Sequence, residues 1–84
     1  MYKKHYRNPA GISQLKRNKI NKLIVDAAVA CIHESGDDLS PKDAVHAVLY
    51  LAGPIEQLHP QAVVLWESYS KGKTRLLNKI AAVV

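Results

Sequence analysis

The chain has 84 residues, a formal net charge of +5 and an apolar fraction of 48%. This length allows one domain, and a single cysteine cannot form an internal disulfide, so nothing indicates an oxidising compartment. No apolar run approaches the roughly 18 residues of a membrane span, and the basic start of the chain lacks the apolar segment of a signal peptide. We therefore expect a cytoplasmic protein that makes no membrane contact.

Charge is distributed unevenly along the chain. Basic residues are concentrated in the first 22 positions and again after residue 70, whereas all seven acids lie between Asp26 and Glu67. A chain with basic ends and an acidic middle presents two unlike surfaces to partners.

The first helix is expected over residues 13–35, behind a stretch without periodicity. Residues 1–11 contain the turn formers Asn8-Pro9 and Gly11, so we interpret them as a mobile basic arm and residues 12–84 as one domain. Ser13 marks the start of the helix, and Gly36 is placed for a left-handed C-cap.

The second half of this helix is apolar on almost every face, so it has to be covered on several sides. Because one neighbouring helix from a short chain does not easily do this, we expect a second copy of the chain to supply cover. The residues predicted for this dimer or partner interface are Leu23, Ile24, Val25, Ala28 and Val29.

The second helix has a well-defined start. Ser40 is the predicted N-cap, Pro41 suits the first helical position, and Asp43 lies in the first turn near the positive end of the helix dipole. Its apolar residues run from Ala44 to Leu51, and Gly53-Pro54 ends it.

Two shorter helical segments complete the chain. One starts at Pro60 and is interrupted at residues 70–72, and the last covers residues 73–84. The apolar face of the first contains Val63, Leu65, Trp66 and Tyr69, and that of the second Leu76, Leu77, Ile80 and Ala81. No stretch alternates as a half-buried strand would. The sequence therefore predicts an all-α fold, a compact helical hairpin or bundle of three to four helices.

The basic N-terminal region is a candidate for nucleic-acid binding, because lysines and arginines can neutralise phosphates. The residues concerned are Lys3, Lys4, Arg7, Lys16, Arg17 and Lys19. Tyr2 and Tyr6 could stack on exposed bases. The basic residues of the helix do not share one face, however, and a solvated helix end behind a solubilising arm is the alternative interpretation.

Catalysis, metals and cofactors have little support in the sequence. None of the four histidines pairs with another at i+3 or i+4, and Cys31 lies in an apolar stripe that disfavours the reactive thiolate. The acids near residues 34–43 suit a solvated turn and a helix cap. We expect no enzyme activity, no cofactor and no metal site.

Residues 24–51, IVDAAVACIHESGDDLSPKDAVHAVLYL, resemble the core of the small bacterial biofilm and acid-resistance regulators typified by AriR (YmgB) and YcgZ. The matching features are the Ala-Val pair before the helix end at Ser35-Gly36, then Leu39-Ser40 and Lys42, and the apolar helix that follows. The resemblance implies an all-helical, dimeric, non-enzymatic regulator that acts through protein partners and DNA. It covers about a third of the chain and carries over no functional residues.

The function expected from the sequence is that of a small non-enzymatic bacterial regulatory or adaptor protein. We expect it to form a homodimer and to bind a macromolecular partner, which we expect to be a protein. One alternative is a nucleic-acid-binding module that uses the basic N-terminal region. The other is a small inhibitor of a host protein encoded by a phage or mobile element.

Overall fold

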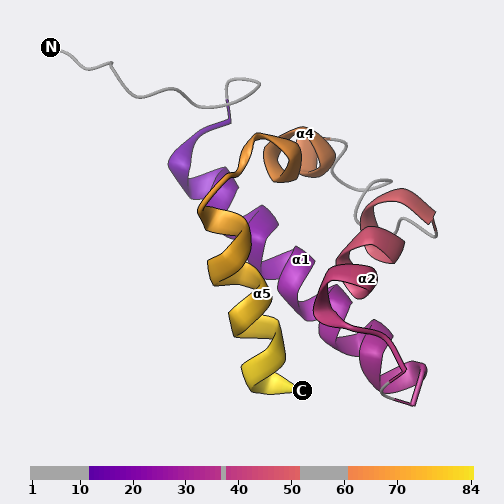
Figure 1. Cartoon of the computed structure of the whole chain (residues 1–84). Helices are drawn as coiled ribbons and strands as arrows, with labels where there is room; N and C mark the ends of the chain where they lie inside the picture. The colour runs from indigo at the N-terminus through magenta and orange to yellow at the C-terminus, as the bar shows by residue number, and fades with distance from the viewer. Residues whose placement is uncertain (1–11, 37, 52–60) are drawn as a thin grey trace, which may run out of the picture.

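The computed structural model describes residues 12–36, 38–51 and 61–84. Within these ranges all regular structure is helical (Figure 1). The elements are α1 (Gln14–Glu34), α2 (Pro41–His46), the π-helical segment η2 (Ala47–Leu51), α4 (Gln61–Ser68) and α5 (Gly72–Val83). The predicted all-α bundle is confirmed. The predicted arm over residues 1–11 and the breaks at residues 53–54 and 59–60 lie outside the described residues.

Both predicted ends of α1 are confirmed. The Ser13 hydroxyl accepts a hydrogen bond from the backbone N–H of Lys16 at 3.2 Å, which satisfies an amide that has no partner inside the helix. At the other end Gly36 adopts a φ of 72°, the left-handed conformation that glycine adopts without a steric penalty. Local chemistry therefore sets the length of this helix.

The start of α2 is also as predicted, but its continuation is not. Ser40 accepts from the backbone N–H of Asp43 at 3.2 Å, and Pro41 begins the helix. After His46 the chain widens into η2. A π-helical turn holds more residues than an α-helical turn, so the inward face shifts. Val48 and Leu49 are buried, whereas Leu51 is 75% exposed and was wrongly expected to share their apolar face.

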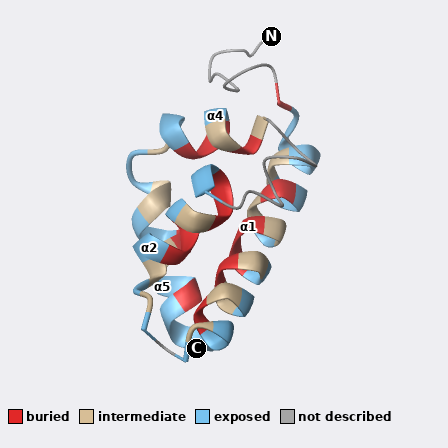
Figure 2. Cartoon of the chain, turned by 90° about the vertical axis from the view of Figure 1, so that its right-hand side faces the viewer, coloured by how far each residue is buried: buried red, intermediate tan, exposed pale blue. Residues whose placement is uncertain are grey.

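The core surrounds α1, which packs against α2, η2, α4 and α5. Figure 2 shows the buried faces of the helices turned toward one another and the exposed faces turned outward. The buried apolar side chains are Ile12, Ile20, Ile24, Val25, Ala28, Ile32, Ala44, Val45, Val48, Leu49, Ala62, Leu65, Trp66, Leu76 and Ile80. Every described helical element contributes to this one cluster.

Helix α5 lies along α1 with one apolar face turned inward. Leu76 and Ile80 are buried and Leu77 is partly buried, as their spacing predicts. Ala81 was expected on the same face but is exposed. It borders a small apolar hollow with Ile32.

Candidate functional site

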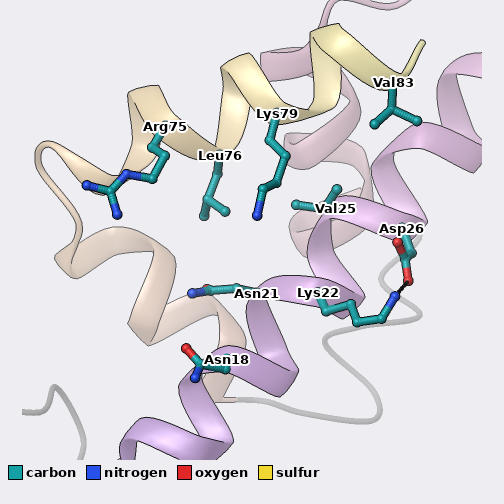
Figure 3. Close-up of a pocket in the computed structure, with 9 residues that line it drawn as sticks. All are labelled: Asn18, Asn21, Lys22, Val25, Asp26, Arg75, Leu76, Lys79 and Val83. Atoms are coloured by element: carbon teal, nitrogen blue, oxygen red, sulfur yellow. Dashed lines mark hydrogen bonds and ion pairs between the residues drawn. The ribbon is translucent and has the colours of Figure 1, made fainter.

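A groove of about 660 Å³ runs between α1 and α5 (Figure 3). We call it the basic groove, and define it by Asn18, Asn21, Lys22, Val25 and Asp26 of α1 and Arg75, Leu76, Lys79 and Val83 of α5.

The helical repeat explains why these side chains meet. Arg75 and Lys79 are four residues apart, so they lie on one side of α5, one turn from each other. Leu76 is buried against the core, and this contact orients α5 so that the flank carrying both cations faces α1. Figure 3 shows Leu76 and Lys79 extending from α5 toward α1, and Arg75 extending toward the segment that connects α4 with α5.

The charge of the groove is predominantly positive. Its described lining contains the three basic residues Lys22, Arg75 and Lys79 and one acid, Asp26. The acid is bound to Lys22, with 3.0 Å between Nζ and Oδ2. Both of these side chains are well exposed, so the pair contributes little to stability. Of the ion pairs between described residues, none involves Arg75 or Lys79.

Two asparagines supply the uncharged polar groups of the groove. The Tyr69 hydroxyl donates a hydrogen bond to Oδ1 of Asn21 at 2.6 Å, and Gln14 Nε2 donates to Oδ1 of Asn18 at 3.0 Å. Each carbonyl oxygen therefore already accepts a bond from a residue of the same chain. The amide nitrogens can only donate, and none of the hydrogen bonds described for these two side chains uses them.

Tyr69 is held in place by its own neighbours. Its ring meets Trp66 edge to face with 6.3 Å between centroids. Gly72 lies so close that a Cβ on it would be 3.4 Å from the Tyr69 ring. Lys73 places its ammonium 5.5 Å from the centre of the Trp66 ring, a cation–π contact. This packing fixes the Tyr69 hydroxyl beside α1.

The nucleic-acid residues expected from the sequence are not the ones that line this groove. Lys3, Lys4 and Arg7 lie outside the described residues. Lys16, Arg17 and Lys19 all lie on α1, but none of them lines the groove. Arg17 is partly buried and donates through Nη1 to Gln14 Oε1 at 3.4 Å.

Val25, predicted for the dimer or partner interface, lines the groove, whereas its other lining residues were not predicted as site residues. The four-residue spacing of Arg75 and Lys79 beside an apolar face was a visible signal. Their approach to Lys22, some 50 positions earlier in the chain, depends on how α5 packs against α1.

The proposed dimer residues are largely used inside the chain. Ile24 and Ala28 are fully buried and Val25 is 8% exposed, while Leu23 and Val29 are partly buried against the same core. Other helices of the same chain pack against α1, so the burial of Ile24, Val25 and Ala28 does not require a second copy. Leu23 and Val29 are the two of the five that retain appreciable exposure.

Other described groups form no comparable cluster. Cys31 is a free, partly buried thiol at the edge of the core. Among the described residues, no three histidine, cysteine or acidic side chains are grouped as a metal site would need. The apolar hollow at the other end of α5 measures about 280 Å³ and is lined by Ile32, Leu39, Pro41, Ala81 and Val84.

The helices were also compared with membrane spans. In the described parts of the chain, no helix has both the length and the apolar character needed to cross a bilayer.

Comparisons of the chain with protein-family models, curated proteins and solved structures gave no match.

Proposed function

We propose that this chain is a small non-enzymatic binding protein of the regulatory or adaptor kind, and that its macromolecular partner is a nucleic acid bound at its phosphates. The observation that supports this proposal is the presence of Arg75 and Lys79 on the lining of one groove where the described acid, Asp26, is already paired with Lys22.

The electrostatics of the groove favour a polyanion. A concave surface lined by one sign of charge raises the local concentration of oppositely charged ligands. Arg75 offers a planar fork of donors that matches two phosphate oxygens, and Lys79 adds a point charge one turn away. Together they can contact successive phosphates of one strand.

This proposal shifts the nucleic-acid contact away from where the sequence placed it. The basic residues of 1–11 can extend such a contact, but they are not needed to define it. A homodimer remains a separate hypothesis, because the groove is formed within one chain.

Salt-dependent binding of labelled oligonucleotides tests the proposal. We expect fluorescence anisotropy to show that duplex or single-stranded probes bind. The logarithm of the binding constant should fall linearly with the logarithm of the salt concentration between about 50 and 200 mM. Replacing Lys79 by Ala should reduce the salt slope by about 0.7 to 0.9, which corresponds to one phosphate contact. Arg75→Ala should do the same.

Lys42→Ala is the matched control, because Lys42 is exposed on α2 and does not line the groove. It removes the same net charge and should leave the slope unchanged. Equal effects of Lys42→Ala and Lys79→Ala would assign binding to net charge and contradict the proposed site. The absence of binding at low salt would contradict nucleic-acid binding altogether and favour a protein partner.

Replacing Lys3, Lys4 and Arg7 together by Ala measures what the N-terminal basic residues add. We expect weaker binding with the effect of Lys79→Ala intact. If this triple variant abolishes binding and Lys79→Ala has no effect, the contact lies in the N-terminal region instead.

A further inference from the structure

The two asparagines that line the basic groove each have a carbonyl oxygen that accepts a hydrogen bond from another residue of the chain. Asn21 and Asn18 both line the groove, while the residues that bind their carbonyl oxygens, Tyr69 and Gln14, do not. The oxygen of each amide is therefore directed toward a partner outside the groove lining. Figure 3 shows the Nδ2 group of Asn21 extending from α1 beneath Arg75 and Leu76, whereas at Asn18 the carbonyl oxygen lies on the side nearer α5.

Most of the polar side-chain groups that line the groove can donate hydrogen bonds. An amide nitrogen, a guanidinium and an ammonium all donate and cannot accept. Asp26 is the acceptor among the described charged side chains that line the groove, and one of its oxygens already accepts a hydrogen bond from Lys22. The matching ligand is a group that carries negative charge and only accepts, and phosphate oxygens have this chemistry.

The hydrogen bonds that hold the two asparagines differ in length, burial and sequence separation. The bond from Gln14 to Asn18 joins two exposed side chains of the same helix. The bond from Tyr69 to Asn21 is shorter, is partly buried, and joins residues 48 positions apart. Since Tyr69 is itself packed against Trp66 and Gly72, the orientation of Asn21 is set by the tertiary fold.

We propose that Asn21 binds a phosphate oxygen in the basic groove, and that Tyr69 is the positioning residue that keeps its amide nitrogen available for this contact. Arg75 and Lys79 neutralise the charge of the same phosphate segment. This inference rests on the proposed function. It adds to the proposed site one specific hydrogen bond, from the uncharged amide of Asn21 to a phosphate oxygen.

Tyr69→Phe is the central test. It removes one hydroxyl and leaves the ring in place, so the Asn21 amide can turn its oxygen toward the ligand. We expect oligonucleotide affinity to fall about 3- to 10-fold, the effect of one hydrogen bond, with the salt slope unchanged because no charge is lost. Tyr50→Phe is the matched control: it also removes a hydroxyl that donates to a side chain, Glu67 at 3.1 Å, but Tyr50 does not line the groove.

A charge-bearing variant strengthens the test. Asn21→Asp replaces the donor nitrogen by an acceptor oxygen and should lower affinity more than tenfold. Asn78→Asp introduces the same charge on an exposed position of α5 outside the groove lining and should have a much smaller effect. Thermal melts of all four variants show whether each remains folded.

The side-chain NH2 resonances of Asn21 report the contact directly. In ¹H–¹⁵N spectra we expect them to shift when an oligonucleotide is added to the wild-type chain, and to shift much less in Tyr69→Phe. A parallel titration with inorganic phosphate distinguishes a backbone phosphodiester from a free phosphate as the source of the ligand.

The outcomes separate this inference from the proposed function. If the wild-type chain binds oligonucleotides and Tyr69→Phe and Asn21→Asp behave like their controls, the inference is wrong and the proposed function stands. If no oligonucleotide binds at low salt but inorganic phosphate shifts Asn21, the proposed function is wrong and the phosphate site belongs to a free ligand. If neither probe shifts Asn21, the phosphate site is overturned.

Discussion

Single residues at the helix ends determine much of the local structure. Ser13 and Ser40 each accept a hydrogen bond from an amide that has no partner within its helix, and Gly36 reverses the chain after α1 in a left-handed conformation. These residues act through backbone geometry and need no distant contact. Asn21 differs from them, because its side chain is bound by Tyr69, which lies in the connection between α4 and α5.

Replacing Gly36 by Ala tests the backbone requirement alone. A Cβ at this position would meet no heavy atom within 4 Å, so the cost comes only from the left-handed conformation. We expect the free energy of unfolding to fall by about 1–2 kcal/mol in urea denaturation. Gly36→Asn is the control and should cost less, since Asn tolerates this conformation better. Equal stability of Gly36→Ala and wild type would contradict the argument.

At the level of elements, α1 and α5 contribute both to the core and to the lining of the basic groove. Each buries one flank in the core and turns a polar flank toward the other helix, which forms the basic groove. The start of helix α5 is less well stabilised by local interactions than the start of α1. Its first turn contains no acid and its N-cap residue, Lys71, makes no side-chain hydrogen bond, so its positive dipole end is uncompensated.

An acid in the first turn of α5 should therefore stabilise the fold. Thr74 is exposed and does not line the groove. We expect Thr74→Glu to raise the free energy of unfolding by about 0.5–1 kcal/mol, through the helix dipole and a higher helix propensity. Thr74→Gln provides the propensity without the charge. The difference between the two variants should shrink in concentrated salt, and a difference that salt does not change would contradict the dipole explanation.

At the scale of the whole molecule, the central question is how the apolar half of α1 is covered. The chain folds α2, η2, α4 and α5 around this helix, so Ile24 and Ala28 reach full burial without a second copy. The same arrangement leaves a basic groove on one side of the bundle. The packing of the other helices against α1 thus accounts for both the core and the candidate site.

Ile24→Ala tests whether this burial belongs to a single chain. Deleting a fully buried isoleucine side chain should cost about 2–5 kcal/mol, whereas Leu15→Ala, at a position that is 77% exposed, should change stability by about 0.5 kcal/mol or less. We expect the loss in Ile24→Ala to be the same at low and high micromolar protein concentration. A midpoint of unfolding that rises with concentration would show that a second copy contributes to this surface.

The sequence by itself determined the all-α class, both ends of α1 and the start of α2. These features depend on contacts within a few residues, such as Ser40 with Asp43 and the backbone of Gly36, so they can be recognised from local patterns. The π-helical turn at η2 and the exposure of Leu51 could not be predicted in this way, because the segment AVLYL contains no capping or turn residue that would mark them.

Which cations line one groove depends on how the helices pack. The sequence favoured the N-terminal lysines and arginines, since they are adjacent in the chain. The fold instead places Lys22 opposite Arg75 and Lys79 and brings Tyr69 to Asn21. Residues some 50 positions apart become neighbours only when α5 docks on α1, and that docking is fixed by the burial of Leu76 and Ile80 in a core shared by all the described helices.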